Sequence, residues 1–125
     1  MSKYAFGKSH RLKSKQQMDQ LFVEGNSFIE FPFKVVWRWV EDTDSSVKIA
    51  LSVPKKKLAK AVHRNQMKRL IRESYRQKNQ GLKLKVSEKV KQLQIMFIFL
   101  DTQLWHFKEI DNKISVTLER LQKMI

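Results

Sequence analysis

The sequence of 125 residues contains no cysteine, only three glycines and only two prolines. The absence of cysteine excludes disulfides and thiolate metal sites, and it fits a reducing compartment. The longest apolar run, residues 95–100, is far too short to span a membrane. The first residues, MSKYAFGKSHRLK, lack the apolar segment of a signal peptide. We therefore expect a cytoplasmic protein with no membrane partner.

Acidic side chains are also scarce. The chain has 12 Asp and Glu against 26 Lys and Arg, which gives a net charge of +14. A small domain with this charge repels itself, so a polyanionic partner is the natural explanation, and a merely soluble basic surface is the alternative. Apolar residues make up 42% of the chain, enough for a packed core. We expect one domain over residues 1–125, beginning with an extended, flexible basic segment at residues 1–13.

The first half of the chain shows the patterns of one helix and two strands. Ser14 and Gln17 have the spacing of a capping box and Gly25 suits a helix end, so we expect a helix between them. Residues 31–40 alternate between apolar and polar as a half-buried strand does. Residues 48–53 predict a second strand, which the following proline ends.

The second half predicts a long helix, a buried strand and a last helix. The long helix covers about residues 58–77, and residues 81–91 fit no single pattern. Residues 95–100 are continuously apolar, as in a central strand buried on both faces. Residues 107–124 carry a helical apolar stripe. With a third short strand early in the chain, the order is α-β-β-β-α-β-α. This order predicts an α+β fold, a two-layer sandwich in which a small central sheet of about four strands packs with helices.

The long helix and the turn before it hold most of the excess charge. Residues 55–78, KKKLAKAVHRNQMKRLIRESYRQK, contain ten Lys and Arg and the single acid Glu73, so they contribute 10 − 1 = +9 of the +14. On a helix of about 100° per residue the cations and the apolar residues separate. The cationic face carries Arg64, Lys68, Arg72 and Arg76, with Asn65 and Arg69 beside them. The apolar face carries Met67, Leu70, Ile71 and Tyr75.

This cationic face favours contact with a nucleic acid. Like charges at i, i+4 destabilise a helix by roughly 0.2–0.5 kcal/mol per pair, and ordinary solvated faces mix both signs, as Lys108, Glu109 and Asp111 do. Contact with phosphates of RNA or DNA explains the face better than solvation does, and it predicts steep salt dependence. Asn65 could read a base edge or could hydrogen-bond the neighbouring backbone.

The segment IALSVPKKKLAKAVHRNQMKRLIRESYR, residues 49–76, resembles the signature of the protein subunit of bacterial ribonuclease P. A strand ending in Ser-Val is followed by paired lysines, by Ala-Val, and by an Arg-Asn helix that ends in Arg-Glu and an aromatic residue. The matching helix positions are Arg64, Asn65, Lys68, Arg69, Leu70, Arg72 and Tyr75. The weaker match near the start of the chain consists of Arg11, Leu12, Met18, Phe22 and Gly25.

Three features depart from the family pattern. Gln66 stands where the family has a second arginine, which weakens or replaces one RNA contact. The crossover KKKLAKAV lacks the usual glycine and is one residue longer. Met18 replaces a phenylalanine, so softer thioether packing replaces ring stacking there.

The resemblance implies both a fold and a function. The fold would include a left-handed βαβ crossover, against the common right-handed rule. In the implied function, a catalytic RNA with RNA-bound Mg²⁺ removes the 5′ leader from precursor tRNA, and the protein binds the catalytic RNA subunit and the precursor tRNA. We then expect no catalytic residue, metal or cofactor in the protein alone, and no obligate protein partner.

The resemblance also implies two sets of RNA-binding residues. The long helix would face the RNA subunit through Arg64, Asn65, Gln66, Lys68, Arg69, Arg72 and Arg76. A cleft between the first helix and the sheet would hold the single-stranded leader, because aromatic and basic side chains bind bases without sequence preference. Its lining would be Arg11, Lys13, Met18, Phe22, Lys34, Val36, Lys55 and Lys56. Met18 and Phe22 could instead be core residues, and Trp37 and Trp39 are expected in the core first.

Other chemistries find little support. His10, His63 and His106 are too scattered for a zinc site, and the chain has no glycine-rich phosphate loop. A self-sufficient nuclease is disfavoured because no histidine and carboxylate cluster is visible. A helix-turn-helix lacks its first short helix. The alternative that stays open is a ribosomal or other structural RNA-binding protein without a role in cleavage.

Overall fold

The computed structural model describes residues 11–12, 14–41 and 45–125. Most of the expected basic segment, residues 1–10 and Lys13, lies outside these described residues. The elements along the described chain are α1 (Lys15–Glu24), β1 (Asn26–Glu30), β2 (Phe33–Glu41), β3 (Val47–Ser52), α2 (Ala61–Lys78), α3 (Gln80–Ser87), β4 (Lys91–Phe99) and α4 (Phe107–Met124). Within the described ranges, no helix has both the length and the apolar character needed to cross a membrane.

The sheet is mixed and has the strand order β1-β2-β4-β3. β2 runs antiparallel to both β1 and β4, whereas β3 runs parallel to β4. β3 and β4 are therefore parallel neighbours connected through α2 and α3, which is the βαβ unit that the resemblance implies. The left-handed sense of this crossover stays a prediction.

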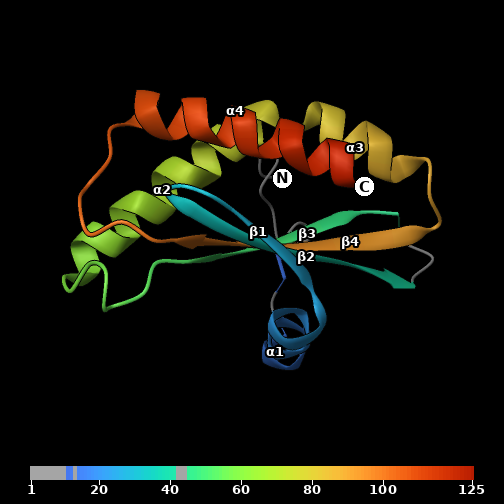
Figure 1. Ribbon diagram of the computed structural model, residues 1–125, viewed down its shortest axis with the longest axis horizontal. Coiled ribbons are helices and arrows are strands. Elements are labelled where there is room, and N and C mark those ends of the chain that lie inside the picture. Colours follow the sequence, from blue (N-terminus) through green and yellow to red (C-terminus); the bar gives the residue numbers. More distant parts are fainter. Residues whose placement is uncertain (1–10, 13, 42–44) are drawn as a thin grey trace, which may run out of the picture.

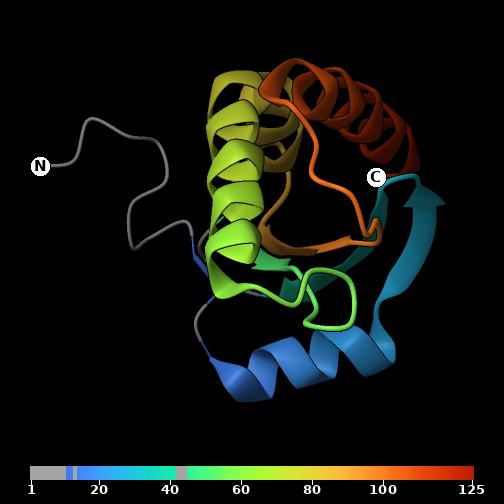
Figure 2. The same ribbon diagram turned by 90° about the vertical axis from the view of Figure 1, so that its left-hand side faces the viewer.

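The helices cover the two faces of the sheet unequally (Figure 1). α2, α3 and α4 lie over one face, where they form the predicted two layers with the sheet, and α1 lies alone across the opposite face (Figure 2). The larger core fills the space between the sheet and the three helices. A smaller core lies under α1 and consists of Leu12, Leu21, Val36, Met96 and Ile98.

The predicted class and element order are confirmed, with shifted boundaries. The strand expected at residues 31–40 begins at Phe33 instead, because residues 31–32 turn the chain between β1 and β2. β4 begins at Lys91, ahead of its apolar run, because Gln92 and Gln94 are buried and bonded to each other, Nε2 of Gln94 to Oε1 of Gln92 at 3.0 Å. The ambiguous residues 81–91 contain most of α3 and the start of β4.

A polar network fixes α1 on the sheet. The guanidinium of Arg38, in β2, donates to Glu24 Oε1 at 2.9 Å and to Gln20 Oε1 at 3.3 Å, both in α1. Its Nε donates to Gln94 Oε1 in β4 at 3.0 Å. At the start of α1 the side chain of Ser14 accepts a bond from the Gln17 backbone N–H, as its sequence predicts. These contacts and the buried Leu21 set the position of the α1 face that carries Phe22.

Gly25 is required by a close approach at the end of α1. Its φ of −75° is open to any residue, so conformational freedom does not explain the glycine. A Cβ at this position would lie 2.5 Å from the Leu21 carbonyl oxygen and 2.7 Å from Cγ1 of Val36. A side chain would therefore force α1 away from the sheet.

We predict that Gly25→Ala lowers the free energy of unfolding by about 1–3 kcal/mol, the usual cost of overpacking. The matched control is Gly81→Ala, whose Cβ would meet only the end of the Gln122 side chain, at 3.1 Å. In the helix α3, alanine is favoured over glycine by roughly 0.5–1 kcal/mol, so this variant should lose no stability. Urea unfolding of both variants measures the difference, and equal losses would contradict the close-approach explanation.

Candidate nucleic-acid interface

Helix α2 is anchored by its apolar side. Met67, Ile71 and Tyr75 are essentially inaccessible to solvent, and Leu70 is half-buried against the same core, which confirms the predicted packed face. Burial also raises the pKa of Tyr75 far above its usual value. On the side of α4, the buried Ser74 donates its hydroxyl to Asp111 Oδ1 at 2.7 Å. The anchored side leaves the basic residues of α2 on the remaining surface of the helix.

The structure divides the predicted cationic face into two surfaces. Lys68 and Arg72 are half-buried and turn toward the edge strand β3. Asn65, Gln66 and Arg69 are exposed and line a shallow hollow on the outer side of the helix together with Val62. We call these two surfaces the edge groove and the outer face of α2. The row formed by Arg64, Lys68, Arg72 and Arg76 spirals around the helix because a spacing of four residues advances by about 400°, which is 40° more than one turn.

The edge groove has a volume of about 210 Å³ and crosses the edge of the sheet at β3. Its cations come from two segments far apart in sequence, Arg11 before α1 and Lys68 and Arg72 in α2. Arg11 reaches the groove because its segment pairs beside β3, where the Leu12 N–H donates to the Ile49 carbonyl at 2.9 Å. The remaining lining residues are Leu12, Met18, Ile49, Ala50 and Leu51.

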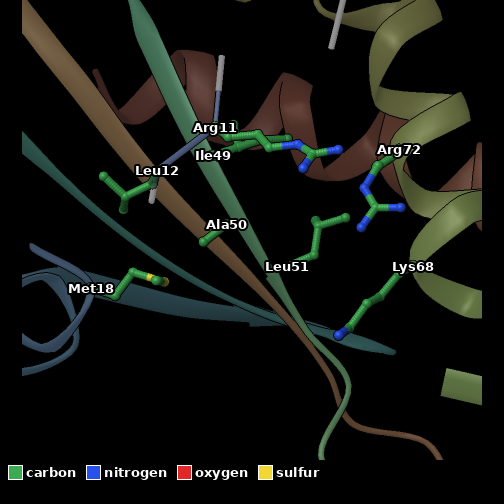
Figure 3. Close-up of a pocket in the computed structure, with 8 residues that line it drawn as sticks. All are labelled: Arg11, Leu12, Met18, Ile49, Ala50, Leu51, Lys68 and Arg72. Carbon is green, nitrogen blue, oxygen red and sulfur yellow. The ribbon is translucent and has the colours of Figure 1, made fainter. Parts of the chain in front are cut away.

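The charges of the edge groove suit an anion. Figure 3 shows the guanidinium groups of Arg11 and Arg72 pointing toward each other, with the Lys68 side chain on the same helix as Arg72. Burial lowers the pKa of Arg72, and the nearby charge of Arg11 lowers it further. A phosphate between these groups would relieve the repulsion and would accept charge-assisted hydrogen bonds from both.

Two other residues of the predicted RNA-subunit set have partners within the protein. Arg64 is half-buried, and its Nη1 donates to the carbonyls of Leu58 and Ala59 at 3.0 and 2.7 Å. Arg76 is half-buried and forms an ion pair with Glu73 one turn earlier in α2. That ion pair also lowers the pKa of Glu73. These two arginines therefore have fewer N–H donors left for RNA than the helical wheel suggests.

The dipole of helix α2 also contributes to the positive potential at the start of the helix. The start of the helix has no acidic residue in its first turn, and the side chain of its N-cap residue, Lys60, makes no capping bond. The positive end of the helix dipole is therefore not compensated by an acidic side chain in the first turn of α2, and Lys55 and Lys56 are exposed in the turn that precedes the helix. The last turn carries Arg76 and Lys78, where cations are favourable to the dipole.

The predicted leader-binding residues lie around α1 with different exposures. Phe22 is 58% exposed, and the Lys34 ammonium lies 5.9 Å from the centre of its ring. Met18 is half-buried and lines the edge groove. Val36 is only 3% exposed and packs under α1, so it supports this surface from below. Trp37 is buried, as expected, and Trp39 is half-buried with the Lys89 ammonium over its ring.

Neither described histidine, His63 or His106, is among the residues that line the edge groove or the hollow on the outer face of α2. His106 caps the start of α4, and its backbone N–H donates to Glu109 Oε1 at 3.0 Å. His63 is half-buried in the first turn of α2. Among the residues that the structure describes, no group of three or more His, Cys, Asp or Glu is placed to hold a metal ion.

The edge groove also shows what sequence reasoning missed. The prediction kept Arg11 and Met18 apart from Lys68 and Arg72, whereas all four line one groove. Its β3 lining, with Ala50 and Leu51, was not predicted as part of a site. The alternation of β3 indicates which residues share a face, but it carries no signal that the strand lies at the edge of the sheet beside the Arg11 segment.

Comparisons with known proteins identify the family to which the chain is similar. A family model described as "Ribonuclease P" matches residues 6–122 of the chain. The chain is 30% identical over 119 residues to a ribonuclease P protein component of Porphyromonas gingivalis, covering 94% of this chain and 87% of that protein.

Solved structures give the same result at the level of the fold. The RNase P protein from Thermotoga maritima is 25% identical, with a TM-score of 0.68 over 88% of this chain and 96% of that chain. The Staphylococcus aureus RNase P protein, 22% identical, shares the fold with a TM-score of 0.64 over 91% of this chain and 96% of its own. Because the family match spans nearly the whole chain and includes the elements that build the edge groove and the outer face of α2, the chain belongs to the ribonuclease P protein family.

Proposed function

We propose that this chain is the protein subunit of a cytoplasmic ribonuclease P and assists the endonucleolytic removal of the 5′ leader from precursor tRNA. The observation that carries the proposal is the convergence of Arg11, Lys68 and Arg72 in one groove of a chain that belongs to this family. The groove and the outer face of α2 provide two adjacent surfaces for RNA. The alternative, a structural RNA-binding protein without a role in cleavage, uses the same charges but predicts no effect on processing.

The outer face of α2 is proposed to bind the catalytic RNA subunit. Asn65, Gln66 and Arg69 are exposed there, and their side chains form no hydrogen bond with another residue that the structure describes. Arg69 can form a forked contact with phosphate, and the two amides can donate to or accept from base edges. Gln66 replaces a charged family contact with a neutral one, so this face should depend less on salt than that of relatives with arginine there.

The surface of α1 is proposed to bind the single-stranded leader. The exposed ring of Phe22 can stack on a base, and the nearby Lys34 can neutralise the following phosphate. Arg11 and Met18 continue the same surface into the edge groove. Lys55 and Lys56 are exposed at the end of β3, where they would add charge for either RNA.

The chemical step is proposed to belong to the RNA subunit. Mg²⁺ held by that RNA would supply the hydrolytic chemistry, and the protein would contribute binding, orientation and charge neutralisation. Each phosphate that the protein neutralises releases counterions, which lowers the Mg²⁺ concentration needed to bring the two RNAs together.

The direct test combines purified protein, RNA subunit and precursor tRNA at low Mg²⁺. We expect 5′ processing to be faster with the protein than with RNA alone, and the protein alone to cleave nothing. RNA binding without any change in processing would favour the structural RNA-binding alternative. Cleavage by the protein alone would place a catalytic centre in the chain and would contradict the proposal.

The edge groove predicts a specific salt effect. Arg72→Gln should weaken RNA binding and reduce the slope of log Kd against log salt by about one, because about one phosphate contact is lost. The matched control is Lys123→Gln, which removes an exposed cation near the end of α4. Affinities of both variants for RNA, measured over a range of salt concentrations, give the two slopes. Identical slopes would refute a phosphate contact in the groove.

The aromatic part of the site is tested with leader-containing RNA. Phe22→Ala should weaken binding of precursor tRNA by roughly 5–150-fold, the range for one stacked base, and should leave binding of mature tRNA unchanged. Val23→Ala is the control, because Val23 is the neighbouring residue of α1 and is 81% exposed. Equal losses for precursor and mature tRNA would show that Phe22 does not contact the leader.

A further inference from the structure

The connection between β3 and α2 is a lysine-rich turn with few internal supports. Residues 54–60 contain Lys55, Lys56, Lys57 and Lys60, whose charges repel one another. Inside the turn, the Lys57 and Leu58 N–H groups both donate to the Pro54 carbonyl, at 3.0 and 3.1 Å. Leu58 is buried in the main core and fixes the middle of the connection, whereas Lys55 and Lys56 are exposed.

Arg64, in the first turn of α2, forms hydrogen bonds with the end of this turn. Nη1 of Arg64 donates to the carbonyls of Leu58 and Ala59, at 3.0 and 2.7 Å. The two carbonyls lie six and five residues before Arg64, so the guanidinium folds back over the start of the helix. The bonds tie the carbonyl oxygens of the turn to the first turn of α2, where the N-cap residue Lys60 makes no side-chain capping bond.

We propose that Arg64 is a positioning residue, which holds the lysine turn in the shape that presents Lys55 and Lys56 to RNA. Its contribution to RNA binding passes through the turn, in contrast to that of Arg69, which is exposed on the outer face of α2. The first arginine of the Arg-Asn motif and the later Arg69 therefore have different roles, although sequence patterns group them as equivalent phosphate contacts. The Nη1 group of Arg64 is directed at the backbone of its own chain.

The turn requires such a support for electrostatic reasons. Exposed lysines gain entropy and lose repulsion when a turn opens. Among the described residues, two backbone bonds, the buried Leu58 and the attraction between Lys57 and Asp101 oppose this opening. Arg64 adds a further positive charge beside the turn, and its hydrogen bonds to the Leu58 and Ala59 carbonyls offset this repulsion. Hydrogen bonds from a charged donor are about twice as strong as neutral ones, so two of them can shift the balance.

The first test follows the free protein by hydrogen exchange and needs no RNA. In Arg64→Ala, the Lys57 and Leu58 amides should exchange about tenfold faster, and the amides of β4 should keep their protection. Arg69→Ala should leave the amides of the turn unchanged. Unchanged exchange of the turn in Arg64→Ala would overturn the proposal. Equal acceleration in β4 would also overturn it, since it would reveal a global effect on the fold.

The second test, which rests on the proposed function, is a double-mutant cycle of affinity for the RNA subunit. Arg64→Ala should weaken binding about tenfold in the natural chain and less than about twofold once Lys55 and Lys56 are both alanine, because its effect passes through them. Arg69→Ala should cost the same factor in both chains. An equal cost of Arg64→Ala in the two chains would identify a direct RNA contact and overturn the proposal.

The two tests separate the positioning role from the proposed function. If Arg69→Ala and the variant without Lys55 and Lys56 bind the RNA subunit as tightly as the natural chain, the assignment of the RNA interface fails. Hydrogen exchange of the turn still decides whether Arg64 holds it.

Discussion

The burial of one side of α2 is the constraint on which the rest of the structure depends. The helix carries six cations, Arg64, Lys68, Arg69, Arg72, Arg76 and Lys78, against the single acid Glu73. Such a helix would be weak in isolation, because its like charges lie one turn apart. Met67, Ile71 and Tyr75 hold it by packing into the core, and Asp111 holds it from α4 through Ser74 and, at 3.3 Å, Lys78. The packing keeps the charges in fixed positions, where a phosphate backbone can use them.

The sheet edge turns this fixed helix into a site. β3 is an edge strand, so its outer side is open to the Arg11 segment and to the cations of α2. On the other face, α1 is set by the Arg38 network and by the close contact at Gly25, which place Phe22 at the surface. The proposed subunit and leader contacts therefore meet at the edge groove, where a small domain could hold two RNAs near each other.

Much of this could be predicted from the sequence, and the failures have physical reasons. Periodicity identified the buried side of α2 and the central β4, because apolar spacing reports burial directly. It did not predict that β4 includes Gln92 and Gln94. Polar side chains are buried where hydrogen-bond partners such as Arg38 are in reach, and periodicity does not report such partners. It treated Arg64 as one more cation, because a helical wheel shows direction but not which backbone carbonyls lie within reach. The grouping of Arg11 with Arg72 depends on a tertiary pairing that no local pattern encodes.

In the proposed assembly, the outer face of α2 contacts the RNA subunit and the surface of α1 contacts the leader. The absence of cysteine allows a single cysteine to carry a tethered hydroxyl-radical source at Val62, Val23 or Val116, which are 67%, 81% and 47% exposed. In the assembled complex, the probe at Val62 should cut the RNA subunit and the probe at Val23 should cut the leader of precursor tRNA. The probe at Val116, on α4, should cut neither. Cutting from Val116 as strong as from Val62, or none from Val62, would contradict the account.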